Sequence, residues 1–145
     1  MRSVLMLKRL LIWTDNDPRR LFLLDGTGAI VSAILLGGVL VNLEWLFGIP
    51  RSALYILAAC PCLFAAYDFY CYQKGPKRLA PYLTGIAAMN AAYCLLSIGL
   101  AIYHKETVTL LGWAYITTEI LIVAFLATFE YQTAKRLAAR TTGNR

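Results

Sequence analysis

Histidine is almost absent from this sequence, since the only one is His104, in a short polar stretch. Histidine is a common ligand of catalytic zinc and of haem iron, so a histidine-based zinc or haem site is excluded. No ten-residue segments of alternating apolar and polar residues occur either, which excludes a membrane β-barrel. No small-residue cleavage site follows residues 1–13, so we do not expect a removable signal peptide.

Charged residues are also scarce. They make up 15% of the chain and hydrophobic residues 59%, whereas soluble domains have about 25% and about 45–50%. This imbalance indicates that lipid is the solvent. Lys and Arg outnumber Asp and Glu by 14 to 8, but the basic residues flank apolar segments and form no continuous patch. Nucleic-acid binding is therefore not expected.

Four long apolar segments dominate the chain, at residues 21–47, 53–72, 79–103 and 108–131. Each meets the requirement of about 20 residues for crossing a bilayer as a helix. Helices are required because an unpaired backbone group is too costly in lipid. Since the connections are short, neighbouring helices must run antiparallel. The predicted fold is an all-α, four-helix up-down bundle that forms a single membrane domain over residues 1–145.

The basic residues predict the orientation of this bundle. Twelve of the fourteen lie before the first span, between the second and third, or after the fourth, while Arg51 and Lys105 lie on the other side. Cytoplasmic loops carry the excess of Lys and Arg, so both termini should be cytoplasmic in a bacterial-type inner membrane. Residues 133–145 are then a cytoplasmic tail.

The first 17 residues are predicted to form a short amphipathic helix on the cytoplasmic leaflet. Val4, Leu7, Leu11 and Trp13 would dip into lipid while nearby basic residues stay at the headgroups. A disordered tail is the alternative.

Polar residues within the spans follow helical spacing. In the third span they form a small and polar stripe that should face the interior, made of Ala87, Asn90, Cys94, Ser97 and Ala101. In the fourth span a similar face holds Tyr115, Glu119 and Glu130. The two glutamates are eleven residues apart, so their directions differ by only about 20° and both should point inward. In the first span Asp25, Ala29, Ala33 and Gly37 recur every four residues, and we expect them to line one side that packs within the bundle.

Depth along the helices divides the polar residues into two layers. Glu119, Asn90, Pro61 and residues 33–37 fall near the midpoints of their spans and make one candidate site. The acids Asp25, Asp68 and Glu130 fall within about two turns of the cytoplasmic ends and make a second, acidic layer.

Glu119 is the most informative residue, because a carboxylate at mid-membrane costs at least about 2.5 kcal/mol. No Lys, Arg or His lies at its depth. A cation would therefore have to come from outside, as a proton, a metal ion or a cationic molecule. The alternative is that neutral Glu119 hydrogen-bonds to Asn90 or to a threonine and serves packing.

The acids of the second layer have an alternative role of their own, which is ion pairing with interfacial cations. The candidate cations are Arg19, Arg20, Lys74, Lys77 and Lys135.

The four cysteines carry little functional signal. Cys60 and Cys62 are two residues apart and so point about 160° apart on a helix, which prevents them from sharing a metal or a disulfide. Cys94 could form a soft-metal site only by meeting one of them near Glu119, and buried inert thiols are commoner. We expect neither a cofactor nor a bound metal.

The functional prediction is a small multi-pass membrane protein with a buried-acid site between helices, handling protons, cations or a small cationic molecule. Its ligand- or ion-binding residues would be Glu119, Asn90, Tyr115, Asp25, Asp68 and Glu130. The expected partners are the lipid bilayer and either further copies of the chain or another membrane protein. The alternatives are an accessory or scaffold protein and a membrane enzyme acting on lipid or quinone. No catalytic residues are predicted.

Overall fold

A computed structural model describes residues 5, 9, 12–14, 16–75 and 78–142. Within them the structure is helical and has no strands. Its elements in chain order are α2 (Arg20–Ile34), the π-helix η1 (Leu35–Leu40), α3 (Glu44–Phe47), α4 (Arg51–Gln73), α5 (Leu79–Tyr103) and α6 (Leu110–Thr142). The predicted all-α four-helix bundle is confirmed. The amphipathic helix predicted for residues 1–17 falls largely outside the described residues.

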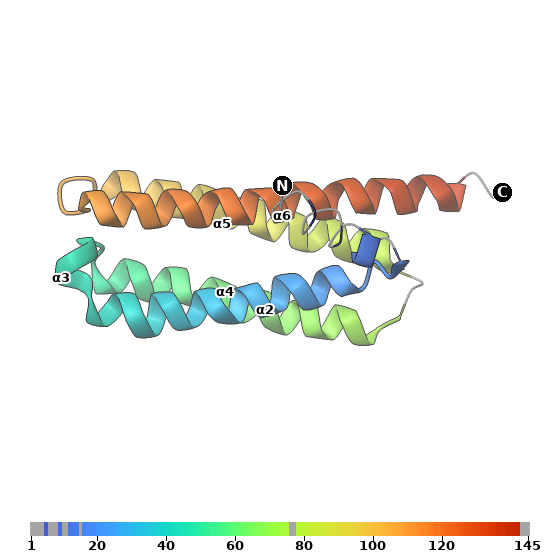
Figure 1. Ribbon diagram of the computed structural model, residues 1–145, viewed down its shortest axis with the longest axis horizontal. Coiled ribbons are helices and arrows are strands. Elements are labelled where there is room, and N and C mark those ends of the chain that lie inside the picture. The colour runs from blue at the N-terminus through green and yellow to red at the C-terminus, as the bar shows by residue number, and fades with distance from the viewer. Residues whose placement is uncertain (1–4, 6–8, 10–11, 15, 76–77, 143–145) are drawn as a thin grey trace.

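The four long helices form two antiparallel pairs (Figure 1). Helix α2, continued by η1, lies along α4, and α5 lies along α6. The two pairs contact each other mainly through α4 and α5. The short helix α3 lies at the end of the bundle where α5 turns into α6. The end where α2 begins, which also carries the carboxyl end of α6, is called the basic end below.

The composition of the helices identifies the chain as a membrane-spanning protein. Four segments are long and apolar enough to cross a bilayer, namely Arg20–Leu40, Arg51–Gln73, Leu79–Tyr103 and Leu110–Thr142. Their outward faces are apolar as well, since Leu63, Leu95 and Leu121 each expose about two thirds of their surface. Such faces suit contact with lipid acyl chains.

The first and last helices differ from the predicted bounds. The first span ends at Leu40, and residues 44–47 form the separate helix α3. The last helix continues to Thr142, although the basic residues predict a tail from position 133 onward. No Gly or Pro occurs between residues 113 and 142, so nothing in the sequence stops it. Its 33 residues span about 50 Å, and Figure 1 shows it extending past the other helices at the basic end.

Glycines bring α2 and η1 close to α4. A Cβ atom at Gly26 would lie 3.2 Å from the Cβ of Asp68, and one at Gly37 would lie 3.2 Å from the Cβ of Ala58. Small residues permit such close approach between helices in lipid. The small residues of the first span therefore pack within the bundle, as expected.

The buried face of the first span is wider than the expected row of four residues, because steps of four residues drift by about 40° around a helix. The buried positions are Leu21, Phe22, Asp25, Gly26, Ala29, Leu36 and Leu40. Ala33 and Gly37 are only half-buried.

Cation–π contacts occur at the basic end of the bundle. Four basic side chains lie over rings, with distances to the ring centroid of 5.4 Å for Arg19 on Tyr72, 4.8 Å for Arg20 on Trp13, 4.9 Å for Lys74 on Tyr70 and 5.8 Å for Lys135 on Tyr131. Aromatic and basic residues together are typical of a membrane interface. The orientation of the termini stays a prediction.

At the opposite end hydrogen bonds join helix α3 to the residue that precedes α6. The Thr109 hydroxyl donates to the Leu46 carbonyl at 2.8 Å, and its backbone N–H donates to the Phe47 carbonyl at 3.1 Å. Gly48 has a left-handed φ of 67°, and a Cβ there would overlap the Thr107 carbonyl. This junction therefore requires glycine at position 48 for both conformation and space.

We predict that Gly48→Ala destabilises the bundle by more than about 3 kcal/mol, because backbone strain adds to an overlap with Thr107. Gly75 is the matched control, since its φ is 78° and a Cβ added there would meet no atom of the described residues within 4 Å. Gly75→Ala should cost about 1–2 kcal/mol from strain only. Thermal unfolding of both variants in detergent checks the order, and equal losses would contradict it.

Candidate functional site: buried acids between the helices

Four acidic side chains are buried between the helices. Their exposed fractions are 4% for Asp25, 0% for Asp68, 7% for Glu119 and 0% for Glu130. Asp25 lies on α2, Asp68 on α4, and both glutamates on α6. The inward direction predicted for the two glutamates is confirmed. Burying a carboxyl group is costly unless a partner compensates it, so their surroundings define the candidate site.

Asn90 on α5 bridges two of these acids. Its amide nitrogen Nδ2 donates to Asp25 Oδ1 at 3.1 Å and to Glu130 Oε2 at 3.2 Å. A carboxamide has two N–H donors, so this one uses both. The stripe predicted for the third span is buried as expected, and Asn90 lies in its middle. The bridge joins α2, α5 and α6 in the bundle interior.

Asp68 completes the group and has the least compensation. Its carboxyl lies beside that of Asp25, and Glu130 is within electrostatic range of both. Neither oxygen of Asp68 has a hydrogen-bond partner among the described residues, and the same holds for Asp25 Oδ2 and Glu130 Oε1. We call Asp25, Asp68, Glu130 and Asn90 the carboxyl cluster.

The cations proposed as alternative partners for these acids have other contacts. Arg19 pairs with Asp17 at 3.4 Å, and Arg20 donates to the Trp13 carbonyl at 3.1 Å. The ammonium groups of Lys74 and Lys135 lie over tyrosine rings. Lys77 lies outside the described residues. Among the described residues the ion pairs of Asp17, Glu44 and Glu106 lie at the ends of the helices, not at the carboxyl cluster.

The predicted pairing of Asn90 with Glu119 is corrected by these bonds. Helical side chains lean toward the N-terminus of their own helix. In the antiparallel pair of α5 and α6, Asn90 therefore leans toward the basic end and Glu130 leans toward the middle of the bundle, so the two meet. Glu119 leans away from Asn90. The two layers inferred from depth are accordingly wrong in one respect, because Asn90 belongs with Asp25 and Glu130.

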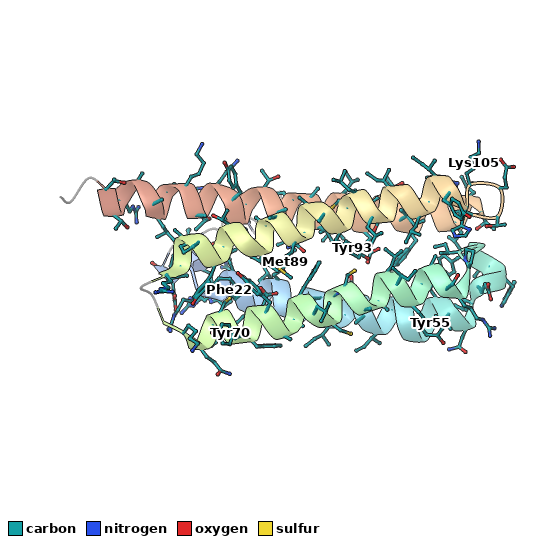
Figure 2. The ribbon with its side chains drawn as sticks, turned by 180° about the vertical axis from the view of Figure 1, so that it is seen from behind. Phe22, Tyr55, Tyr70, Met89, Tyr93 and Lys105 are labelled. Carbon is teal, nitrogen blue, oxygen red and sulfur yellow. The ribbon has the colours of Figure 1, made fainter. Side chains whose placement is uncertain are left out.

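Glu119 has different partners. The Ser32 hydroxyl on α2 donates to Glu119 Oε1 at 3.0 Å. The hydroxyl groups of Tyr93 and Tyr115 lie within electrostatic range of the same carboxyl. Tyr93 is 4% exposed, and its hydroxyl has no hydrogen-bond partner of good geometry among the described residues. Figure 2 shows Tyr93 in the middle of the bundle, between the two helix pairs.

Two hollows adjoin these acids. A central cavity of about 60 Å³ lies between all four long helices, and its polar lining is Asp25, Ser32, Asn90 and Tyr93. A larger groove of about 450 Å³ lies between α2 and α6, and Glu119 and Tyr115 are in its wall. Gly28, Ser32, Ile122 and Val123 line both hollows. We call the larger one the α2–α6 groove. The two hollows therefore share a wall at the level of Ser32.

The cysteines do not join the site. All four are free thiols, with Cys62 exposed, Cys60 half-buried, and Cys71 and Cys94 buried. The Cys94 thiol lies 3.8 Å from the Ile120 carbonyl. In residues 16–75 and 78–142 no three Cys, His, Asp or Glu side chains converge as a metal site would require.

Ser32 and Tyr93 are site residues that the sequence prediction omits, although a signal for each is present. Ser32 follows Asp25 by seven residues, and Tyr93 follows Asn90 by three, so each shares a helix face with a predicted site residue. Hydroxyl groups at these offsets are expected to line the same interior.

Comparison with protein-family models, with curated proteins and with solved structures found no match for this chain.

We predict that Asn90→Leu destabilises the bundle by about 1–3 kcal/mol, because Asp25 and Glu130 each lose a buried hydrogen bond. Asn42 is the matched control, since its amide is exposed and donates to the Gly38 carbonyl of its own turn. Asn42→Leu should change stability by less than about 0.5 kcal/mol. Unfolding in detergent measures both, and a similar loss in the two variants would show that the bridge does not stabilise the bundle.

Proposed function

We propose that this chain is a small multi-pass membrane protein that binds and exchanges protons at the carboxyl cluster. The observation that carries the proposal is Asp68, which is fully buried beside Asp25 with neither oxygen hydrogen-bonded among the described residues. A proton on either carboxyl converts this close contact into an O–H···O hydrogen bond. The proton is thus the ligand that best fits the pair.

Electrostatics favours a variable number of protons in the cluster. Three carboxylates within range of one another would repel strongly in a medium of low dielectric constant. Asn90 has only two N–H donors, and they go to Asp25 and Glu130. Bound protons reduce the remaining charge. Groups that interact this closely take up and lose protons as a unit.

The central cavity supports a path from the cluster to Glu119. It borders Asp25, Asn90 and Ser32, and Ser32 donates to Glu119. Its volume of about 60 Å³ exceeds the roughly 10–15 Å³ that one water molecule needs, and hydroxyl and carboxyl groups line it. Protons that enter at the basic end would reach Glu119 along this line. On this proposal Glu119 handles a cation in exchange for protons, and because four helices are few for a transport path we expect a homo-oligomer.

A second candidate is a packing role in an accessory or scaffold protein. The observation that favours it is the Asn90 bridge, which joins α2, α5 and α6 whether or not any proton leaves. The two candidates differ in whether the acids titrate.

Infrared difference spectra recorded between low and high pH test the proposal on the protein in lipid vesicles. Protonated carboxyl groups in a dry interior give a carbonyl band that is lost on deprotonation. We expect this band in the parent protein and expect Asp68→Asn to remove a large part of it. Asp17 is the control, because it precedes α2 by three residues and pairs with Arg19 at the surface, and Asp17→Asn should leave the band unchanged.

Circular dichroism and gel filtration establish that each variant is folded. A parent spectrum without the band, or an Asp68→Asn spectrum equal to that of the parent, would overturn proton exchange at this cluster and favour packing.

A further inference from the structure

The α2–α6 groove lies on the lipid side of the bundle. It is bounded by α2, by the first residue of η1 and by α6, and α2 and α6 have few direct contacts with each other in the described residues. Val31 on α2 and Ile122 on α6 border it, and both are more than half exposed. Because these helices cross the membrane, the groove opens toward acyl chains rather than toward bulk water.

The polar groups of the groove are unequal. Thr27 donates to the Leu23 carbonyl at 2.6 Å, and Thr118 donates to the Ala114 carbonyl at 2.7 Å, so each hydroxyl is bonded within its own helix. These two side chains add little recognition. The polar groups that remain are Ser32, Tyr115 and Glu119.

Charge in the groove has one sign. Glu119 is its ionisable acid, and none of the residues that line it is Lys, Arg or His. Ser32 fixes the carboxyl through Oε1, and the Tyr115 hydroxyl lies near it. The Tyr93 hydroxyl is within electrostatic range of the same carboxyl, and Tyr93 lines the central cavity. An acid beside an aromatic ring in a dry wall complements a cation.

The rest of the groove wall is apolar and favours a ligand that has an apolar part. Leu24, Val31, Leu35, Ile122 and Val123 line the groove. A hydrated inorganic ion gains nothing from such a surface, whereas an organic cation with aromatic or aliphatic groups buries area against it.

We infer that the α2–α6 groove binds an amphipathic organic cation that enters sideways from the lipid, with its charge at Glu119 and its apolar body between α2 and α6. This inference rests on the proposed function in naming the cation that Glu119 handles. Two other occupants are conceivable, and the tests below distinguish them. A lipid acyl chain would bind without any contribution from Glu119, and a helix from a second copy of the chain would cover the groove.

Binding of tetraphenylphosphonium to the full chain in phosphatidylcholine nanodiscs tests the sign of the charge. We expect saturable binding of about one ion per chain, and no saturable binding of tetraphenylborate, which has the same shape and the opposite charge. Glu119→Gln should weaken binding of the cation at least tenfold. Glu106→Gln, at an exposed loop acid, should leave it unchanged. Equal binding of both ions, or unaltered binding to Glu119→Gln, would overturn the inference.

Filling the groove provides a test that keeps the acid. A Cβ atom added at Gly28 meets no atom of the described residues within 4 Å, so we expect Gly28→Leu to fold while its side chain occupies part of the groove. We expect it to lower the affinity for tetraphenylphosphonium at least tenfold. Gly99 on α5 is equally open but is not among the groove residues, so Gly99→Leu should bind like the parent.

Oligomeric state, measured in parallel, separates a covered groove from a binding groove. If the parent fails to bind tetraphenylphosphonium and Gly28→Leu dissociates an oligomer, a second copy occupies the groove and the inference fails. Asp68→Asn separates this inference from the proposed function, because it should remove a large part of the infrared band and leave binding of the cation intact. If Asp68→Asn reduces the band but the parent protein does not bind the cation, cation binding in the groove is refuted and proton exchange at the carboxyl cluster stands.

Discussion

The structure depends on burying carboxyl groups in a membrane interior without a basic partner among the described residues. Asp68 and Glu130 are fully buried, and Asp25 nearly so, while Arg19, Lys74 and Lys135 lie at aromatic rings of the basic end. Compensation comes instead from one neutral amide, Asn90, which donates to two carboxyls from a third helix. Neutral donors cost less to bury than cations, but they cancel no charge. The described side chains therefore supply hydrogen-bond donors to the cluster but no counter-charge.

Packing decides which acids meet. Gly26 lets α2 approach the Cβ of Asp68 on α4, which brings Asp25 and Asp68 together. On α6 the spacing of eleven residues keeps Glu119 and Glu130 on one face but about 16 Å apart along the axis. One glutamate thus enters the carboxyl cluster, and the other lies in the wall of the α2–α6 groove. A single helix face serves two sites with different neighbours.

Much of this architecture is predictable from the sequence, because lipid leaves few alternatives. Hydropathy is sufficient to predict four helices, and helical periodicity is sufficient to predict that Asn90, Glu119 and Glu130 point inward. The depth of each polar residue along the bundle is harder to predict. Counting residues from the ends of the spans assumes that all helices end at the same level and that side chains stand perpendicular to the helix axis. Helix α6 continues to Thr142, and the lean of Asn90 and Glu130 along their antiparallel axes brings them together. The groove is beyond sequence reasoning, because it depends on how far apart α2 and α6 lie.

Helix α2 connects the two sites physically. Asp25 and Ser32 lie seven residues apart on it, about 10 Å along the axis, and each bonds to a different helix. Because α2 carries both residues, its position relative to α5 and α6 sets the length of the Ser32–Glu119 bond and of the Asn90–Asp25 bond. The placement of this one helix therefore decides which donors reach Glu119 and which reach the carboxyl cluster.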